Sequence, residues 1–140
     1  MEYEIAISCG VFDCLHKGHI ELLQMLKNKG KRVIIFVHDD KSTFLNKGKF
    51  PVQKLEQRVF NLIDCELVNE IIIVNDKNPL SRLTKFIAGK DKKDMVYIRG
   101  DDWKDAPAIK ELIEMGIKVI FKPYTQGVSS TEIRNEVLKR

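Results

Sequence analysis

The sequence predicts an α/β fold: one domain with a five-stranded parallel sheet and helices on both faces. Short β-branched runs alternate with segments of helical periodicity, and the strand-like runs are apolar throughout rather than alternately polar. A chain of 140 residues with 44% hydrophobic content suits one core of ordinary size. No repeat, low-complexity tract or linker divides it, so residues 1–140 are expected to form one domain.

The five predicted strands are residues 5–9, 32–37, 70–74, 95–99 and 118–121. Strands that are apolar on both sides are covered on both sides, so we expect helices above and below the sheet. Because crossovers between parallel strands are right-handed, the carboxyl ends of all the strands should share one edge.

Apolar residues at helical spacing predict four helices between the strands. The four stripes are Ile20, Leu23 and Leu26; Leu55, Val59, Leu62 and Ile63; Leu80, Leu83, Phe86 and Ile87; and Ile109, Leu112 and Ile113, which Gly116 ends. A last helix is predicted from about residue 131 to residue 138.

The segment from Gly10 to His19 reads Gly-Val-Phe-Asp-Cys-Leu-His-Lys-Gly-His and joins the first predicted strand to the first predicted helix. A helix N-terminus offers N–H groups and partial positive charge to a phosphate. His16 and His19 can face one anion, and Gly18 lets it approach closely. We interpret this segment as a site of phosphate chemistry. The alternatives are a zinc site that includes Cys9 and Cys14, and an ordinary pair of loop histidines.

The same residues resemble the signature of the nucleotidylyltransferase superfamily, and in particular its small cytidylyltransferases. The resemblance covers nearly the whole chain. Four further segments are similar to motifs of that family in the same order: Lys47 with Lys49, residues 56–58 (Glu-Gln-Arg), residues 100–103 (Gly-Asp-Asp-Trp) and residues 125–131 (Thr-Gln-Gly-Val-Ser-Ser-Thr). The resemblance implies a Rossmann-like domain that transfers a nucleotide to a phosphorylated acceptor.

All these motifs except residues 56–58 lie in segments that come after predicted strands, so they should meet at the carboxyl edge of the sheet, where such folds bind ligands. The resemblance and this placement together give three sets of expected site residues. The catalytic set is His16, His19, Lys49 and Ser129. The nucleotide-binding set is Gly10, Val11, Phe12, Asp13, Gly18, Lys47, Arg99, Gly100, Asp102, Tyr124, Gln126, Gly127, Ser130 and Thr131. The acceptor-binding set is Arg58 and His38.

Several of these residues have a plainer reading. Lys47 and Lys49 are expected in a polar loop that closes over the β- and γ-phosphates, although such a loop can be merely solvated. Asp13 can orient a histidine, help to hold Mg²⁺ or simply make a turn. Ser129 and Glu132 form a capping-box pattern, which caps a helix with or without a ligand. Trp103 is either near the nucleoside or part of a core or interface. Mg²⁺ is the expected cofactor, held mainly by phosphates.

The composition of the chain bears on which classes of partner it binds and on where in the cell it is expected. The net charge of +4 is mild and spread along the chain, so it does not indicate nucleic-acid binding. Three cysteines without a pairing pattern, and the lack of a secretory signal or a long apolar span, favour a reduced cytoplasmic protein that does not enter membranes. By analogy with the family, the chain is expected to form a homodimer.

The sequence departs from the glycerol-phosphate enzymes of that family at Tyr124, Gln126, Glu66 and Asn69. Tyr124 replaces an arginine, which changes what can be recognised, although Arg99 can supply a compensating charge. The expected function is therefore transfer of CMP from CTP to glycerol 3-phosphate or another small phosphorylated metabolite, with release of pyrophosphate. Two alternatives stay open: an adenylyltransferase that uses ATP, because residues 128–134 also resemble the closing motif of nicotinamide mononucleotide adenylyltransferases, and a non-catalytic nucleotide-binding module.

Overall fold

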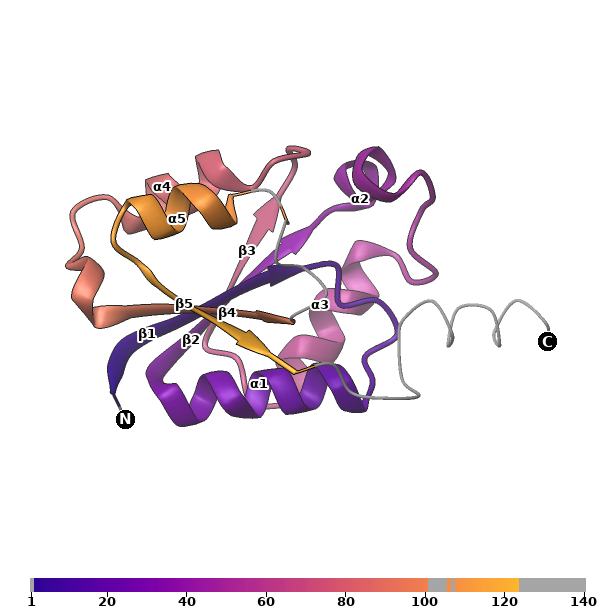
Figure 1. Ribbon diagram of the computed structural model, residues 1–140. Coiled ribbons are helices and arrows are strands. Elements are labelled where there is room, and N and C mark those ends of the chain that lie inside the picture. Colours follow the sequence, from indigo (N-terminus) through magenta and orange to yellow (C-terminus); the bar gives the residue numbers. More distant parts are fainter. Residues whose placement is uncertain (1, 101–105, 107, 124–140) are drawn as a thin grey trace.

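A computed structural model describes residues 2–100, 106 and 108–123 of the chain (Figure 1). The strands are β1 (Tyr3–Gly10), β2 (Gly30–His38), β3 (Glu70–Val74), β4 (Met95–Gly100) and β5 (Lys118–Lys122). The helices are α1 (Lys17–Lys29), α2 (Asp40–Lys47), α3 (Leu55–Asp64), α4 (Leu80–Ile87) and α5 (Ile109–Glu114), with a short 3₁₀ turn, η1 (Lys92–Asp94), before β4.

The strands form one parallel sheet in the order β3-β2-β1-β4-β5. The five predicted strands are confirmed, and most of them extend by one or two residues beyond the predicted limits. The chain moves outward from β1 in one direction to β3 and then crosses over to β4 on the other side. In folds of this kind the crevice for a ligand lies at that reversal, outside the carboxyl ends of β1 and β4.

Helices cover both faces of the sheet, as predicted (Figure 1). One face buries Leu23 and Leu26 of α1 and Leu62 of α3 against apolar residues of β1, β2 and β4. The opposite face buries Leu83 and Ile87 of α4 together with Ile109 and Leu112 of α5. Most residues of the stripes read from the sequence therefore point into two cores with the sheet between them, but Ile63 and Ile113, which were predicted in the stripes, are 61% and 53% exposed.

Helix α2 was not predicted, and its polarity explains why. Its buried positions carry Ser42 and Thr43, whereas Phe44 and Leu45 are exposed, so the pattern of an amphipathic helix is inverted. Asp39 caps the helix by accepting a hydrogen bond from the Ser42 N–H, and Gly48 ends it in the left-handed conformation at φ 73°. Lys47 is consequently the last residue of a helix and does not lie in a loop.

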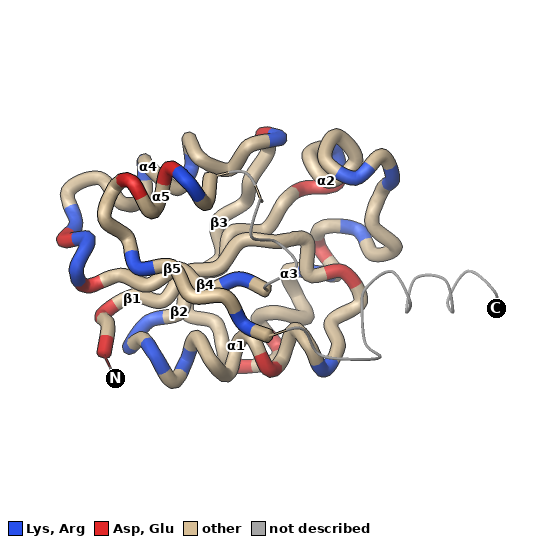
Figure 2. The backbone as a smooth tube through the Cα atoms, viewed as in Figure 1, with Lys and Arg blue, Asp and Glu red and all other residues tan. Residues whose placement is uncertain are grey.

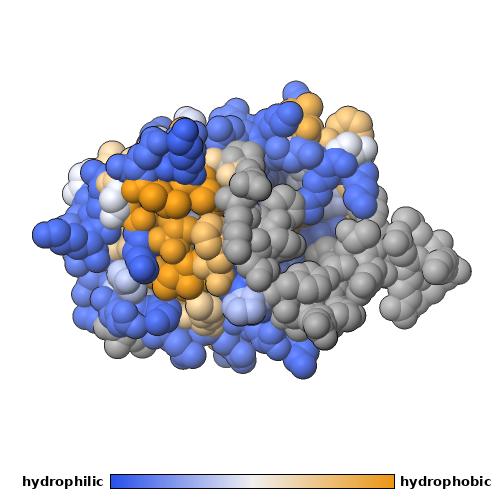
Figure 3. Space-filling model, in the orientation of Figure 1, coloured by the Kyte–Doolittle hydropathy of each residue, from blue (hydrophilic) through white to orange (hydrophobic). Residues whose placement is uncertain are grey.

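The surface of the described residues is mostly hydrophilic, with an apolar area over β5 and beside α5 in the view of Figure 3. Ile113 of α5 is 53% exposed, and β5 is an edge strand without a further strand beside it among the residues described. In the described part of the chain, no helix is long and apolar enough to cross a membrane.

Candidate active site

His16 and His19 form the beginning of helix α1. The Nδ1 atom of His16 accepts a hydrogen bond from the Gly18 N–H at 3.0 Å, and the Nδ1 atom of His19 accepts one from the His16 N–H at 3.2 Å. The two rings stack with their centroids 3.9 Å apart, and Phe12 lies 5.4 Å from the His19 ring. The histidines thus cap their own helix, in a reciprocal arrangement usually made by a hydroxyl and a carboxylate.

This arrangement determines where each imidazole carries its proton. A nitrogen that accepts a backbone N–H has no proton of its own, so both neutral rings are protonated at Nε2. Burial lowers the pKa of His16, and burial together with the charges of His16 and Lys47 lowers the pKa of His19 to about 3. At neutral pH the pair therefore consists of two uncharged rings, each with an N–H that can donate to an anion.

The loop from Val11 to Leu15 carries the chain from β1 to this pair. The carboxylate of Asp13 is buried and accepts hydrogen bonds from the Val52 N–H at 2.7 Å and the Gln53 N–H at 2.9 Å. Asp13 therefore attaches the loop after β1 to the segment that leads into α3. The observed bonds are those of a structural acceptor between two loops, a role that the sequence did not predict for Asp13.

Arg58 was expected to contact the acceptor, and the structure corrects this expectation. Its side chain on α3 is 0% exposed. The guanidinium donates to the carbonyls of Gln53, Val11 and His38 and to the carboxylate of Asp40, at distances of 3.1, 2.8, 2.8 and 2.6 Å. Because all three guanidinium nitrogens are engaged in the protein interior, Arg58 holds together the loops that follow β1 and β2 and the segment before α3.

Lys47 and Lys49 are both exposed, on either side of Gly48. The rings of Phe44 and Phe50 stack across this tip with centroids 4.7 Å apart. Figure 2 shows basic residues along α2 and the loop after it. Lys47 contributes to the low pKa of His19, which places its charge near the histidine pair.

His38 is the last residue of β2 and Arg99 is the next-to-last residue of β4, and both lie on the α4–α5 side of the sheet. The Nδ1 atom of His38 lies 3.0 Å from the Ser42 hydroxyl, and burial is the main cause that lowers its pKa to about 4. Arg99 is 8% exposed and donates to the Tyr97 hydroxyl at 3.3 Å. The positive charge of Arg99 also lowers the pKa of His38, so the two side chains belong to one neighbourhood at the carboxyl edge.

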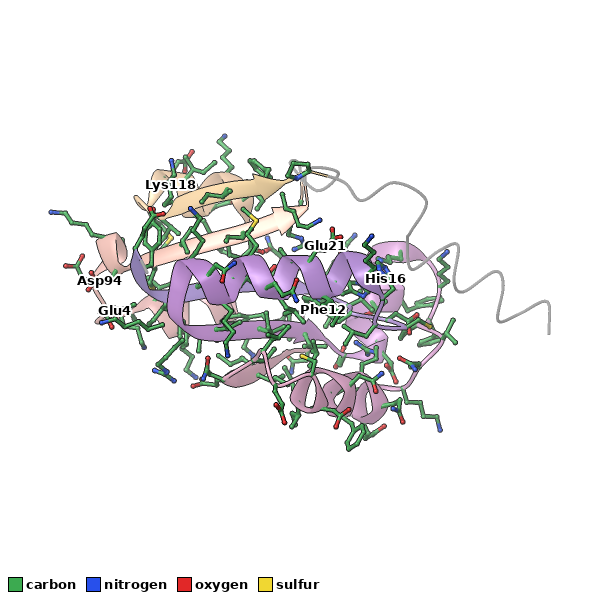
Figure 4. All side chains as sticks on the ribbon, turned by 90° about the horizontal axis from the view of Figure 1, so that it is seen from below. Glu4, Phe12, His16, Glu21, Asp94 and Lys118 are labelled. Atoms are coloured by element: carbon green, nitrogen blue, oxygen red, sulfur yellow. The ribbon has the colours of Figure 1, made fainter. Side chains whose placement is uncertain are left out.

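Figure 4 shows where the histidine pair lies relative to the rest of the sheet. His16 and Phe12 lie at one end of α1, and Glu4, Asp94 and Lys118 lie toward the other end. Glu66 and Asn69 precede β3 and therefore belong to the amino edge of the sheet with the latter group. The expectation that these two departures bear on the acceptor is corrected, because the motifs are at the opposite edge.

The described residues contain no group of three or more His, Cys, Asp or Glu side chains placed to hold a metal ion. Cys9 is buried in the α4–α5 core, and burial raises the pKa of its thiol. The zinc alternative therefore gains no support from the geometry around His16. The predicted residues Asp102, Trp103, Tyr124, Gln126, Gly127, Ser129, Ser130 and Thr131 lie outside the described residues.

Comparison with known proteins assigns the chain to a family. A family model described as cytidylyltransferase-like matches residues 7–136, a range that includes both histidines and strands β2 to β5. The chain belongs to the cytidylyltransferase-like family. It is accordingly a nucleotidyltransferase with a Rossmann-like fold.

Individual relatives cover most of the chain. Glycerol-3-phosphate cytidylyltransferase of Bacillus spizizenii is 35% identical over 133 residues, 94% of this chain and 95% of the relative. The bifunctional protein HldE of Blochmanniella floridana is 32% identical over 133 residues, which are 93% of this chain but 26% of that protein. A solved structure described as the lipopolysaccharide core biosynthesis protein from Thermoplasma volcanium superposes with a TM-score of 0.67 and 26% identity, covering 87% of this chain and 98% of that one.

Proposed function

We propose that this nucleotidyltransferase uses CTP and transfers CMP to a small phosphorylated metabolite. The observation that carries the proposal is the pair of neutral imidazoles at the start of α1, each protonated at Nε2 and lying at the crevice beside β1. The full-length similarity to a glycerol-3-phosphate cytidylyltransferase supports the choice of nucleotide and of acceptor class.

In the proposed reaction, a phosphate oxygen of the acceptor forms a bond to the α-phosphorus of CTP, and the bond from that phosphorus to the bridging oxygen breaks. Pyrophosphate leaves with the electron pair of that bond. Because the attacking oxygen is already anionic, the reaction needs placement and charge stabilisation more than it needs a base. His16 and His19 donate from Nε2 to the phosphate oxygens, and these hydrogen bonds strengthen as charge builds. Lys47 and Lys49 neutralise the leaving phosphates.

Mg²⁺ is the proposed cofactor, and the residues present fit an ion held mainly by phosphates. The described side chains form no three-ligand group, and the Asp13 carboxylate already accepts two backbone N–H groups. Mg²⁺ commonly keeps several waters and binds through substrate phosphates with few protein ligands. When bound, it would supply further neutralisation of the triphosphate charge.

For the acceptor we propose glycerol 3-phosphate or another phosphorylated precursor of a surface polysaccharide. The relatives named for glycerol 3-phosphate and for lipopolysaccharide core biosynthesis support this range. Arg99 and His38, which lie in one neighbourhood at the carboxyl ends of β4 and β2, are proposed to face the acceptor side of the crevice. Arg99 would supply there the positive charge that Tyr124 cannot.

ATP is the second candidate nucleotide, because residues 128–134 resemble the closing motif of nicotinamide mononucleotide adenylyltransferases. Thermal unfolding with each nucleotide and Mg²⁺ separates the two candidates. A ligand at one hundred times its dissociation constant stabilises a protein by about 2.7 kcal/mol. The nucleotide that binds more tightly should therefore raise the melting temperature by a given amount at a lower concentration than the other nucleotide needs.

The function is tested by pyrophosphate release from CTP or ATP with a panel of phosphorylated alcohols, sugars and amines, followed by mass spectrometry of the products. A CDP-linked product from CTP is the expected result. Binding of CTP without product for any acceptor would instead favour a non-catalytic module. By analogy with the family, we also propose that the protein is a cytoplasmic homodimer. Sedimentation of the purified chain measures the number of subunits.

A further inference from the structure

The loop that leads to the histidine pair has an energetically costly backbone. Phe12 and Cys14 have φ values of 54° and 51°, in the left-handed region that residues other than glycine rarely adopt. Such conformations are energetically unfavourable for residues other than glycine, and they persist where the surroundings hold them in place. The contacts of this loop should therefore include groups whose role is to maintain its shape.

Gln53, in the segment before α3, takes part in four hydrogen bonds, two of them with residues of this loop. Its backbone N–H donates to Asp13 at 2.9 Å, and its carbonyl accepts from Arg58 at 3.1 Å. Its side-chain Oε1 accepts the N–H of left-handed Cys14 at 3.1 Å, across 39 positions of sequence, and also accepts from Asn61 of α3 at 3.3 Å. The side-chain oxygen thus joins the peptide before Cys14 to helix α3.

We propose that Gln53 is a positioning residue for nucleotidyl transfer: its Oε1 holds the left-handed Cys14 peptide and thereby sets the direction in which His16 and His19 present Nε2. Cys14 precedes His16 by two residues, so a rotation of its peptide reaches the helix cap directly. The inference deepens the proposed function and rests on it for its kinetic consequence.

The hydrogen bonds of Oε1 also determine which side chain can replace Gln53. Both groups that contact Oε1 are donors, namely the Cys14 N–H and the Asn61 side-chain amide. Methionine preserves the length and volume of the side chain without that acceptor, whereas glutamate retains it. Neither change alters the backbone bonds that Gln53 forms with Asp13 and Arg58.

Asn69 offers a matched control at the opposite edge of the sheet. Its side-chain Oδ1 accepts the Val33 N–H at 2.8 Å, the same kind of bond across 36 positions, but it lies before β3 and away from the histidines. Asn69→Ala and Gln53→Met should therefore both lower the melting temperature, because each leaves a backbone N–H without its acceptor. Only Gln53→Met should impair the site.

The kinetic test compares the wild type with Gln53→Met, Gln53→Glu and Asn69→Ala in the transfer assay. We expect Gln53→Met to lower kcat about tenfold while the KM for CTP changes about twofold or less, because misplaced donors weaken transition-state contacts more than binding. Gln53→Glu should recover most of kcat. Wild-type kcat in Gln53→Met, equal losses in Gln53→Met and Asn69→Ala, or a Gln53→Glu variant no better than Gln53→Met would overturn the proposal.

A second readout does not depend on activity. The chain has three histidines, so their imidazole NMR signals can be assigned by substitution. Gln53→Met should shift the signals of His16 and His19, and Asn69→Ala should leave them in place. If the NMR signals of both His16 and His19 stay in place in Gln53→Met, the positioning role is wrong even if the wild type transfers the nucleotide. If the wild type transfers no nucleotide but the shifts occur, the proposed function fails and the structural role of Gln53 stands.

Discussion

His16 and His19 present their Nε2 protons because the backbone of their own helix occupies Nδ1. The pair is therefore a set of oriented, uncharged donors, and its contribution should appear in the transition state. We expect His16→Ala and His19→Ala each to lower kcat by a factor on the order of 100, which corresponds to about 3 kcal/mol of barrier.

Steady-state kinetics of nucleotidyl transfer measure this effect. Lys17→Ala is the control on the same turn of α1, since its side chain is 73% exposed and forms a long ion pair with Glu21, at 3.9 Å. It should retain kcat within about twofold. A loss of less than about threefold in both histidine variants would show that the pair does not donate to the reacting phosphate.

The low pKa of His19 also makes stability depend on pH. Its pKa is about 3 in the folded protein against an ordinary value of 6.5, so between these values the unfolded chain binds a proton that the folded one excludes. The free energy of unfolding is consequently highest above pH 6.5 and falls as the pH decreases through that window. His19→Asn removes the titrating group but keeps an oxygen that can accept the His16 N–H.

Urea unfolding at a series of pH values between 4 and 8 tests this dependence. His19→Asn should reduce the slope of unfolding free energy against pH by up to about 1.4 kcal/mol per pH unit below pH 6. An unchanged slope would mean that His19 is protonated equally in the folded and unfolded chains.

At the residue scale, the sequence predicted that His16 and His19 lie at the start of a helix but not how they are held, and it placed Lys47 in a loop although this residue ends α2. Spacing alone shows that His16 and His19 share a helix start, whereas the Nδ1 bonds that select the tautomer depend on backbone geometry. Arg58 was placed with the ligand-binding residues because a cation near phosphate motifs suggests that role. Its burial depends on carbonyls from two loops and from the end of β2, and no local sequence pattern indicates that they converge. Nothing in the sequence distinguished Gln53 from a surface glutamine.

At the scale of elements, the hydrogen bonds of Arg58 connect α3 to the segments that follow β1 and β2. We expect Arg58→Lys to lower the free energy of unfolding by about 3 kcal/mol, because one ammonium cannot serve the four acceptors that surround the buried guanidinium. Urea unfolding measures the loss. Arg32→Lys is the matched control, since its ion pair with Glu70 is exposed and should change stability by less than about 0.5 kcal/mol. Equal effects of the two variants would contradict the bracing role.

The start of β2 depends on close contact with β1. A Cβ atom at Gly30 would lie 2.7 Å from the Ala6 backbone nitrogen and 2.8 Å from the Ala6 Cβ, and the sheet gives these atoms little room to move. Gly30→Ala should therefore destabilise the protein by about 1–3 kcal/mol. Gly89→Ala, at φ 78° with open space around it, should cost about 1 kcal/mol through backbone strain alone. Thermal unfolding that ranks Gly89→Ala as the more damaging change would refute this account of the contact.

The sequence predicted the helices whose apolar residues are buried in a core. It did not predict the helix that is stabilised mainly by its capping residues. Most of the apolar residues in the stripes of α1, α3, α4 and α5 face a core, so these helices could be predicted from periodicity, although Ile63 and Ile113 are exposed. Helix α2 instead depends on the Asp39 cap, on Gly48 and on hydrogen bonds from Ser42 and Thr43 to the Asp39 carbonyl, so its polar inner face hid it. This helix matters for the site because Lys47 is its last residue, so α2 fixes the position from which the segment with Lys47 and Lys49 begins.

At the scale of the whole molecule, the parallel sheet gathers distant segments at one edge. The order β3-β2-β1-β4-β5 puts the carboxyl ends of β1 and β4 side by side, and the carboxyl end of β2 lies next to that of β1. Five continuous apolar runs were enough to predict this edge, because crossover handedness allows few alternatives. The acceptor could not be predicted in the same way, since its recognition depends on a few side chains rather than on the fold.

The most direct measurement is a crystal structure of the protein with Mg²⁺ and a non-hydrolysable CTP analogue. Our account predicts that the triphosphate lies outside the carboxyl ends of β1 and β4, with α- or β-phosphate oxygens within hydrogen-bonding distance of Nε2 of both His16 and His19. A nucleotide bound elsewhere on the molecule, or imidazoles that turn Nε2 away from the phosphates, would contradict it.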